Sequence, residues 1–463
     1  MYNKSYCCHK KERTVALEKS VISTVLKKLN TDGNQAYLVG GFVRDSLMGR
    51  ETHDIDITTS ALPDRICELF CDFRVILTGS AHGTVTVIID DVPIEITTFR
   101  TETGYSDNRH PDKVRFTGSL SEDLSRRDFT MNAVAMDVDG KIVDPLDGRK
   151  DIEAGIIRCV GEAEKRFRED SLRILRALRF ASQLGFSIEK NTEEALFSCS
   201  KLLKNISAER VCSELSGLIC GKNADEVILK YGRILAVVLP CFSSMIGFEQ
   251  HNRHHCFDVF EHSVHVLENV RPVLHLRLAA LLHDCAKPLC FSVDESGTGH
   301  FYGHAPKGAD LAMEELKRLR FDNDTIEKAV KLIRIHDSPV ECDDRTVKRK
   351  LNRLGKDMFF DLVELQRADN LAQSEEYRFR QYNFDRLEKI ACEIIAQDEC
   401  FSLKKLAVNG NDMLALGFRG SDVGKSLGYL LNCVIDGVTV NERSALLEKA
   451  EHDREKIVAS EKN

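Results

Sequence analysis

Two acidic residues at alternate positions, Asp54 and Asp56, stand in the stretch AYLVGGFVRDSLMGRETHDIDITT over residues 36–59. In an extended strand over residues 54–57 both carboxylates lie on one face, with the intervening isoleucines packed behind them. Two carboxylates held side by side repel each other unless a cation lies between them. A divalent metal is the usual cation, and Mg²⁺ that carries a nucleoside triphosphate prefers such a pair. We therefore predict a catalytic metal site at Asp54 and Asp56.

A glycine pair precedes these acids. An apolar run over residues 37–39 predicts a buried strand, and Gly40 and Gly41 lead from it into helix-like residues that end near Gly49. The glycines let backbone N–H groups approach a phosphate, and the positive end of the following helix points at it. Arg44, one turn into that helix, is placed to reach the same phosphates. Since an acid-x-acid pattern alone is common in strands, the metal-site prediction depends on both features together.

The combined pattern resembles the head of the class II transfer-RNA nucleotidyltransferases, the CCA-adding enzymes, and of their relatives, the bacterial poly(A) polymerases. A second run, RRDFTMNA over residues 126–133, closely matches the RRDFTxNA element of the same family. In that family the arginine beside the aspartate contacts nucleotide phosphate, and the aspartate and asparagine help to form the sugar pocket. The resemblance implies these roles for Arg127, Asp128 and Asn132; a charged helix start is the alternative.

A predicted amphipathic helix follows in the stretch KRFREDSLRILRALRFASQLGF, residues 165–186. A solvated charged face explains its periodicity. Its segment EDSLR resembles the EDxxR motif of class II enzymes, in which the protein itself acts as the template. Aspartate accepts from the exocyclic amine of C or A, and arginine donates to a ring nitrogen or carbonyl. The resemblance implies base recognition by Asp170 and Arg173, with Arg176 and Arg179 facing the triphosphate or the RNA end.

Poly(A) polymerase, or an enzyme that adds only A, is the close alternative. Three features favour CCA addition: the complete EDxxR motif, the uninterrupted loop YSDNRHPD at residues 105–112, and VILTGSAHGTVTV at residues 75–87, where polymerases tend to carry a basic motif. All three arguments rest on resemblance. We expect the addition of C, C and A to tRNA from CTP and ATP, with Mg²⁺ in the head.

Histidines and aspartates recur at the ends of apolar helical stretches between residues 251 and 375. The aspartate in AALLHD needs a partner, because an unpaired buried charge is costly. A lone histidine is usually an ordinary residue, but six such groups in the order H…HD…H…H…D resemble the HD phosphohydrolase domain with its ligands for two metals. Imidazole and carboxylate ligands suit Mn²⁺, Ni²⁺, Fe or Mg²⁺ rather than structural zinc. The resemblance implies the ligands His262, His283, Asp284, His304, His336 and Asp369.

A metal-bound water in such a site would attack a phosphoester. Some CCA-adding enzymes carry this domain with 2′,3′-cyclic phosphodiesterase, 2′-nucleotidase and phosphatase activity, so we expect a second, hydrolytic activity. The additional histidines His254, His255 and His265 are expected to be ordinary. Two hypotheses from other classes stay open: a dedicated HD phosphohydrolase whose head only binds RNA, and a non-catalytic RNA-binding module.

Composition agrees with an enzyme of this kind. No apolar run approaches the roughly 18 residues of a membrane span, and the first residues lack the apolar core of a secretory signal. Sixteen cysteines occur without a CxxC pair, many of them within apolar helical patterns, which favours a reducing cytoplasm. The net charge of −8 does not exclude an RNA partner, because phosphate binding depends on local patches.

The predicted fold class is α+β, with a length that suggests about three domains. A helix over residues 61–70, capped by Ser60, is expected after the acidic strand, and the region 207–248 is expected to be helical with little chemical signal. Glu95 is either a third metal ligand or a solvent-facing residue. We divide the chain into a small mixed-sheet nucleotidyltransferase head, an all-α neck, an HD domain and a helical RNA-binding tail, at residues 15–148, 149–250, 251–375 and 376–463.

Two stretches of the tail side are predicted to contact an RNA backbone. The first is a basic helix within residues 345–356, for which a solvated charged face is the open alternative. The second is GFRGSDVGKS, residues 417–426, which fails as a Walker loop because only three residues separate Gly420 from Gly424. We expect two short helices to meet at Gly417 and Gly424 instead.

Overall fold

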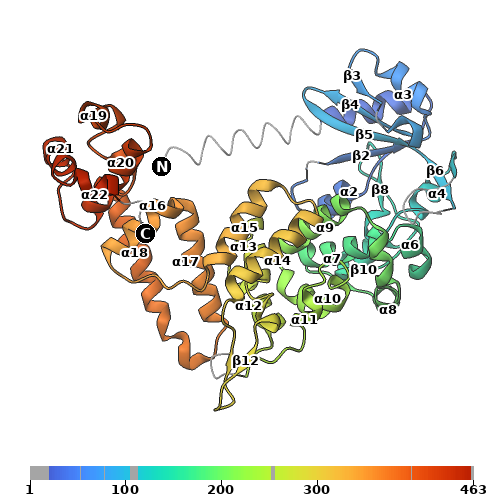
Figure 1. Ribbon diagram of the computed structural model, residues 1–463. Coiled ribbons are helices and arrows are strands. Elements are labelled where there is room, and N and C mark those ends of the chain that lie inside the picture. Colours follow the sequence, from blue (N-terminus) through green and yellow to red (C-terminus); the bar gives the residue numbers. More distant parts are fainter. Residues whose placement is uncertain are drawn as a thin grey trace. The chain divides into compact units, whose positions relative to one another are not determined.

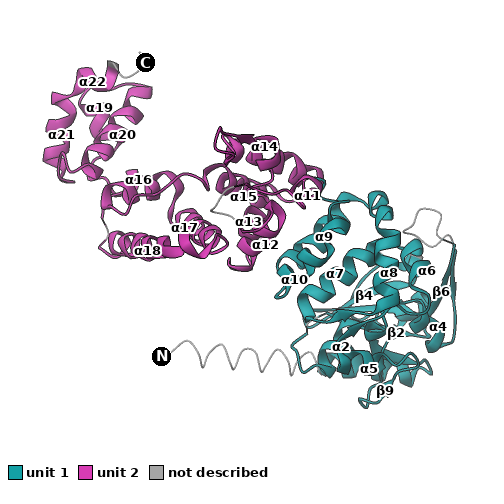
Figure 2. Cartoon of the chain, turned by 90° about the horizontal axis from the view of Figure 1, so that it is seen from below, with its two compact units in different colours: residues 1–240 teal, residues 241–463 magenta. Residues whose placement is uncertain are grey.

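The computed structural model describes residues 20–52, 54–77, 79–104, 113–251, 256–397 and 399–459. The chain forms two compact units, residues 1–240 and 241–463 (Figure 2). No helix within the described ranges is both long and apolar enough to cross a membrane. The loop at residues 105–112 and the histidines His254 and His255 lie outside these ranges. The division into four segments stays a prediction.

A seven-stranded mixed sheet organises the first unit, with the strand order β3-β4-β5-β2-β1-β8-β9 (Figure 1). The central strand β2 pairs antiparallel with β1 and parallel with β5. The alternating isoleucines of β2 and β5 are buried. The strands, in sheet order, are Arg74–Ile76, Thr84–Ile89, Val92–Thr98, Ile55–Thr59, Ala36–Val39, Ala135–Met136 and Ile142–Val143.

Helices surround and follow this sheet. A helix at residues 20–31 comes first, and the later helices of the unit pack mainly on one another, with α7 against α9 and α10. Two small ladders complete the unit, β6 (Arg100–Thr103) with β7 (Lys113–Phe116) and β10 (Ile156–Ile157) with β11 (Ser187–Ile188). The helices are α2 (Gly41–Leu47), α3 (Pro63–Leu69), α4 (Leu120–Ser125), α5 (Gly148–Ala154), α6 (Ala163–Glu169), α7 (Leu172–Leu184), α8 (Lys190–Cys199), α9 (Ala208–Ile219) and α10 (Ala224–Leu235).

Among its described residues, the second unit contains helices and one small hairpin, β12 (Ser292–Val293) with β13 (Gly299–His300). A mixed sheet followed by helices confirms the predicted α+β class. The helices are α11 (Phe242–Met245), α12 (Val259–Glu268), α13 (Leu274–Leu282), α14 (His304–Arg318), α15 (Asn323–Ile335), α16 (Asp344–Leu354), α17 (Lys356–Leu371), α18 (Gln381–Ala396), α19 (Gly410–Ala415), α20 (Ser421–Ile435), α21 (Arg443–His452) and α22 (Arg454–Ala459).

Two local expectations were wrong. The helix after the acidic strand begins at Pro63 and has Leu62 as its N-cap, not Ser60, because the residue before a proline is pushed into the extended region. Ser60 instead accepts a hydrogen bond from the backbone N–H of Gln35. In the tail, Gly424 lies inside α20, so the turn between α19 and α20 contains Gly417 and Gly420 rather than ending at Gly424.

Candidate functional site

Asp56 in β2 is the register partner of Glu95 in the parallel strand β5, so their side chains leave the same face of the sheet. Burial raises the pKa of Asp56 to about 6; Arg127 opposes this rise, and the carboxylates of Glu95 and Asp54 add to it. Asp54 directly precedes β2. Carboxylates that repel one another in this way fit a divalent cation.

The carboxylates of Asp54, Asp56 and Glu95 do not by themselves form a complete metal site. No three ligand atoms lie within 4.8 Å of one another among the described residues of this unit. Mg²⁺ commonly takes only one or two carboxylates from a protein and its other ligands from substrate phosphates and water. The donor set therefore fits an ion that arrives with a triphosphate.

Gly40 lies between a carboxylate and a guanidinium. Its φ of +70° favours glycine, and a Cβ atom at this position would lie 3.2 Å from Oδ2 of Asp56 and 3.4 Å from Nη1 of Arg127. The backbone after β1 thus passes close to both groups because no side chain keeps it away. This arrangement leaves the two charged groups near one short stretch of backbone. The approach of that backbone to a phosphate stays a prediction.

The side chain of Arg127 is half-buried and lies next to the carboxylate of Asp123, which also contacts other residues. Its Nη2 lies 3.6 Å from Oδ2 of Asp123, and the same oxygen accepts a hydrogen bond from Thr58. The other carboxylate oxygen, Oδ1, pairs with Nη2 of Arg126 at 2.8 Å. The Nε of Arg127 has no hydrogen-bond partner within the described part of the chain. A buried N–H of this kind is costly unless it is paired, so this edge of the guanidinium suits an anionic ligand.

Four predicted nucleotide-binding residues form one connected network. Arg44 donates from Nη1 to Oδ1 of Asn132 at 2.8 Å, and Asn132 donates from Nδ2 to Asp128 at 3.2 Å. Arg176 donates from Nε to the other oxygen of Asp128 at 2.9 Å. Burial alone would raise the pKa of Asp128, but Arg176 and Arg173 outweigh it and hold the pKa at about 2. Asp128 is therefore an anion that joins α7 to the segment after α4.

The ring of Phe180 lies at the centre of three arginines. The guanidinium carbons of Arg44, Arg176 and Arg179 are 5.0, 5.4 and 4.4 Å from its centroid. Arg179 also donates from Nε to Oε2 of Glu214 in α9, at 2.6 Å. The arginine-rich face of α7 is thus held by acids and an aromatic ring rather than being simply solvated.

The two predicted base-reading residues are each fixed by their own partners. Asp170 accepts from Nη2 of Arg210 at 2.8 Å and from the backbone N–H of Leu172 at 3.1 Å. Arg173 donates to Oε2 of Glu169 at 3.1 Å and to the carbonyls of residues 126 and 166, both at 3.2 Å. Both side chains are therefore held in defined positions at the start of α7.

The expectation that residues 207–248 carry little chemical signal was wrong. Arg210 and Glu214 of α9 supply direct partners to Asp170 and Arg179. Their spacing of four residues puts them on one face of a helix, which is the sequence signal that would have identified them.

In the second unit, two groups of possible metal ligands share Asp284. One consists of His262, His283 and Asp284, and the other of Asp284, His304 and His336. The ligand atoms within each group lie within 4.8 Å of one another. Asp369 completes the predicted set, because its Oδ1 lies 2.9 Å from Nε2 of His262. The six residues come from α12, α14 and α17 and from the residues that follow α13 and α15.

Backbone carbonyls orient three of these imidazoles. The Nδ1 atoms of His283, His304 and His336 lie 2.8, 2.8 and 2.7 Å from the carbonyl oxygens three residues before each of them. With the proton on each Nδ1, the three Nε2 atoms lie 3.1, 3.4 and 3.8 Å from carboxylate oxygens of Asp284, and those of His304 and His336 lie 3.3 Å from each other. A cation between them would take these Nε2 atoms as lone-pair donors. Nitrogen and carboxylate donors arranged in this way fit a pair of divalent cations.

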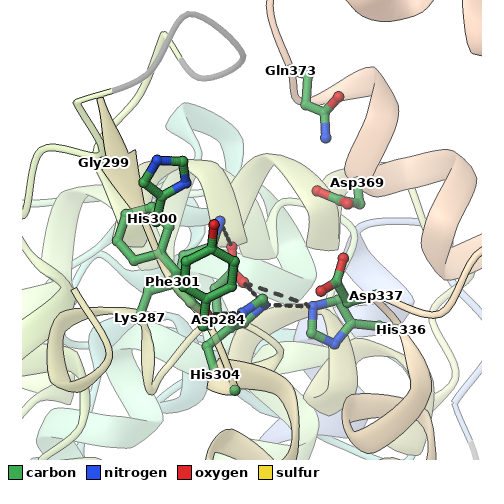
Figure 3. A pocket seen from close by; sticks show the side chains of 12 residues that line it. Asp284, Lys287, Gly299, His300, Phe301, His304, His336, Asp337, Asp369 and Gln373 are labelled. Atoms are coloured by element: carbon green, nitrogen blue, oxygen red, sulfur yellow. Dashed lines mark hydrogen bonds and ion pairs between the residues drawn. The ribbon is translucent and has the colours of Figure 1, made fainter. Parts of the chain in front are cut away.

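A cavity of about 350 Å³ opens beside this cluster (Figure 3). Lys287 lines it, with Nζ 2.6 Å from Oδ2 of Asp284 and 2.8 Å from Oε1 of Gln250. Asp369 and Gln373 lie on one side of the cavity, and His300 and Phe301 lie on the other. The cluster thus has room for a substrate next to it.

Family models match three parts of the chain. They are described as "Poly A polymerase head domain" at residues 36–158, "Probable RNA and SrmB- binding site of polymerase A" at residues 185–245, and tRNA nucleotidyltransferase domain 2 at residues 307–450. The first covers the sheet with its carboxylates, and the second begins at the end of α7 and includes α9.

Similar curated proteins are CCA-adding enzymes. The chain is 50% identical over 204 residues to that of Geobacillus thermodenitrificans, which is 44% of this chain and 50% of the relative. It is 55% identical over 190 residues to that of Lactobacillus johnsonii, 41% of this chain and 47% of the relative. The chain thus spans about half the length of the curated relatives it matches.

Solved structures extend the similarity to nearly the whole chain. The Thermotoga maritima CCA-adding enzyme complexed with tRNA shares the fold at a TM-score of 0.60 and 20% identity, covering 95% of both chains. The Bacillus stearothermophilus CCA-adding enzyme in complex with CTP is 30% identical with a TM-score of 0.68, covering 94% of this chain and 98% of the other. Because this 30% identity extends over 98% of the solved enzyme, the chain belongs to the CCA-adding enzyme family.

Proposed function

We propose that this chain adds C, C and A to the 3′ ends of tRNA, using CTP and ATP. The observation that carries the proposal is the similarity to a solved CCA-adding enzyme in complex with CTP. The two chains are 30% identical, and the match covers 98% of that enzyme. The connected network around Asp128 supports it, since it brings together the residues that a nucleotide would contact.

In each addition the 3′ hydroxyl oxygen of the RNA bonds to the α-phosphorus of the nucleotide. The bond from that phosphorus to the bridging oxygen breaks, pyrophosphate leaves with the electron pair, and the hydroxyl proton is released. Asp54 and Asp56 would hold Mg²⁺, which activates the hydroxyl and neutralises the triphosphate when bound. Arg127 would take a phosphate oxygen at its buried Nε, and Asp128 and Asn132 would contact the sugar.

Asp170 and Arg173 would select the base by hydrogen bonds from fixed positions. Their partners, Arg210 and Glu169, hold them before any nucleotide arrives, so little reorganisation is needed on binding. Arg176 and Arg179 are committed to Asp128 and Glu214 and would act on the triphosphate through their remaining N–H groups. The partners of this activity are tRNA, CTP and ATP.

One assay separates CCA addition from its alternatives. The chain is incubated with Mg²⁺ and tRNA that ends before CCA, with CTP, ATP or both. We expect two C residues with CTP alone, no extension with ATP alone, and arrest after CCA with both. A long A tail with ATP alone would identify a poly(A) polymerase. In a parallel reaction with tRNA that ends in CC, extension of that RNA but not of the shorter one would identify an A-adding enzyme. If no nucleotide is added, the result favours the hypothesis that the head only binds RNA.

We also propose a second activity, metal-dependent phosphohydrolysis in an HD domain. The favouring observation is the pair of ligand groups that share Asp284 next to a cavity. With a 2′,3′-cyclic nucleotide, a water oxygen bonds to phosphorus, one ring P–O bond breaks, and the leaving ribose oxygen takes a proton. The bound Mn²⁺, Ni²⁺ or Mg²⁺ would activate that water. Chelator-treated chain with each metal added back should hydrolyse the cyclic nucleotide, and inactivity with all three metals rejects the activity.

A further inference from the structure

The cavity beside the six predicted metal ligands has an aromatic surface that phosphoester hydrolysis itself does not require. Its lining includes His300, Phe301 and Tyr302. Tyr302 is 80% exposed and stacks on His300, with ring centroids 5.4 Å apart and planes only 8° from parallel. A single exposed tyrosine is ordinary. A parallel pair of rings at the edge of a cavity lined by metal ligands is a more specific arrangement.

The supporting ring of this pair is held in place. Nε2 of His300 lies 2.8 Å from Oδ2 of Asp294, and the other oxygen of Asp294 accepts backbone N–H groups of Ser296 and Thr298 at 2.9 and 3.0 Å. The β12–β13 hairpin therefore fixes the imidazole from within its own turn. Because the imidazole of His300 is already ordered, stacking another ring on Tyr302 costs little additional conformational entropy of the protein.

The neighbouring ring has a different role. Phe301 packs against Phe291, with centroids 5.6 Å apart, and Nζ of Lys287 lies 5.3 Å from the centroid of the Phe301 ring. Phe301 therefore belongs to the wall beside Lys287 and Asp284, while Tyr302 projects into solvent. His304, one of the predicted ligands, follows Tyr302 by two residues. A phosphoester bound at the ligands would thus place its remaining atoms near the exposed ring.

We propose that Tyr302, supported by His300, stacks the nucleobase of the substrate whose phosphoester is hydrolysed in this cavity. The inference rests on the hydrolytic function proposed above and names its substrate class as base-bearing nucleotides or RNA ends. Aromatic rings stack on all four bases, so this contact selects for a base but not among bases. Recognition by stacking would allow the site to act on any 3′-terminal residue.

The test compares two substrates with the same reacting group. 2′,3′-cyclic AMP and glycerol 1,2-cyclic phosphate both carry a five-membered cyclic phosphodiester, but only the first has a base. We expect the ratio of their kcat/KM values to fall about 5- to 150-fold in Tyr302→Ala, the range for loss of one base–aromatic stack. Tyr302→Phe should keep the wild-type ratio. The control is Tyr382→Ala, since Tyr382 is 71% exposed in the same unit and does not line this cavity.

The outcomes distinguish the inference from the function on which it rests. A ratio that stays unchanged in Tyr302→Ala, while both compounds are hydrolysed, overturns the stacking role and leaves the hydrolase in place. An equal fall in Tyr302→Phe also overturns it, because the phenyl ring can still stack. If the wild-type chain hydrolyses neither compound with any of the three metals, the hydrolytic function fails and the stacking role fails with it.

Discussion

Arg210 in α9 donates a hydrogen bond from Nη2 to Oδ2 of Asp170 at 2.8 Å, across 40 residues of sequence. The bond fixes the carboxylate at the junction of α6 and α7, where the base-reading residues lie. An acid that is free to rotate would accept hydrogen bonds from several base edges, whereas a fixed one accepts from one direction. If Asp170 reads the base, as we propose, Arg210 is a positioning residue for base selection, and this role has a measurable consequence.

Arg210→Ala should reduce the preference for CTP and ATP over UTP and GTP by about tenfold, the effect of one lost hydrogen bond to a charged group. Single-nucleotide incorporation rates measure this preference, and Arg210→Lys should restore part of it. Arg233→Ala is the control, since Arg233 is an exposed arginine of the neighbouring helix α10. Equal slowing of all four nucleotides in Arg210→Ala would show a merely structural role.

Asp170→Ala should have a larger effect on the same preference. The change removes the acceptor for the exocyclic amine and leaves the arginines around Phe180 in place, so addition slows while UTP and GTP gain relative to CTP and ATP. Each mispaired polar group costs about 1–3 kcal/mol, which is about 5- to 150-fold in selectivity. The comparison uses incorporation rates of wild type and variant at matched nucleotide concentration. An unaltered preference would reject the template role.

Asp54→Ala should abolish nucleotide addition and leave phosphohydrolysis unchanged. The expectation follows from separate ligand sets, because the acids at β2 lie in the first compact unit and the histidine cluster lies in the second. Both activities are measured on the same preparation, with tRNA and with a 2′,3′-cyclic nucleotide. Simultaneous loss of both would contradict the two-site picture.

Asp284→Asn should have the opposite effect, because Asp284 belongs to both ligand groups of the second unit. We expect Mn²⁺ to raise the Tm of the wild type, since a ligand that binds only the folded state stabilises it. We expect the variant to lose both this rise and hydrolysis. Nucleotide addition should persist. His283→Ala should behave similarly, and a Tm rise that persists in both variants would place the metal elsewhere.

Gly148→Ala should destabilise the first unit by about 2 kcal/mol. A Cβ atom at Gly148 would lie 2.1 Å from the carbonyl oxygen of Thr130 and 2.6 Å from Cγ2 of Val134, both of them buried and unable to move freely. Urea unfolding of the two proteins gives the difference in the free energy of unfolding. Gly118→Ala is the matched control, because an added Cβ there meets no atom within 4 Å and should change stability by less than about 0.5 kcal/mol.

Local sequence patterns were enough to locate the carboxylates of the head and the arginine-rich helix α7. The alternation of acids and isoleucines predicted a strand at residues 54–57, and β2 covers Ile55–Thr59. The start of α3 at Pro63 was also within reach, because a proline restricts the residue before it. These features depend on neighbours in sequence, which is why a single sequence reveals them.

Contacts between residues that are distant in sequence could not be predicted from local sequence patterns. The partners of Asp170 and Arg179 come from α9, whose position depends on how it packs against α7. The order of histidines and acids predicted six ligands, but only the meeting of five helical segments shows that Asp284 belongs to both groups. The stacked pair His300 and Tyr302 likewise depends on a hairpin turn that Asp294 holds.

The pairing of Asp56 with Glu95 links the activity of the head to the correctness of its folding. Successive residues of a strand face opposite sides, so a slip of β2 by one residue would turn Asp56 into the interior and expose Ile55 and Ile57. A sheet that buries its isoleucines has therefore already aligned its carboxylates. The burial that stabilises the head thus disfavours soluble molecules in which β2 has a shifted register. The specific activity of a preparation therefore reports the fraction of correctly folded protein.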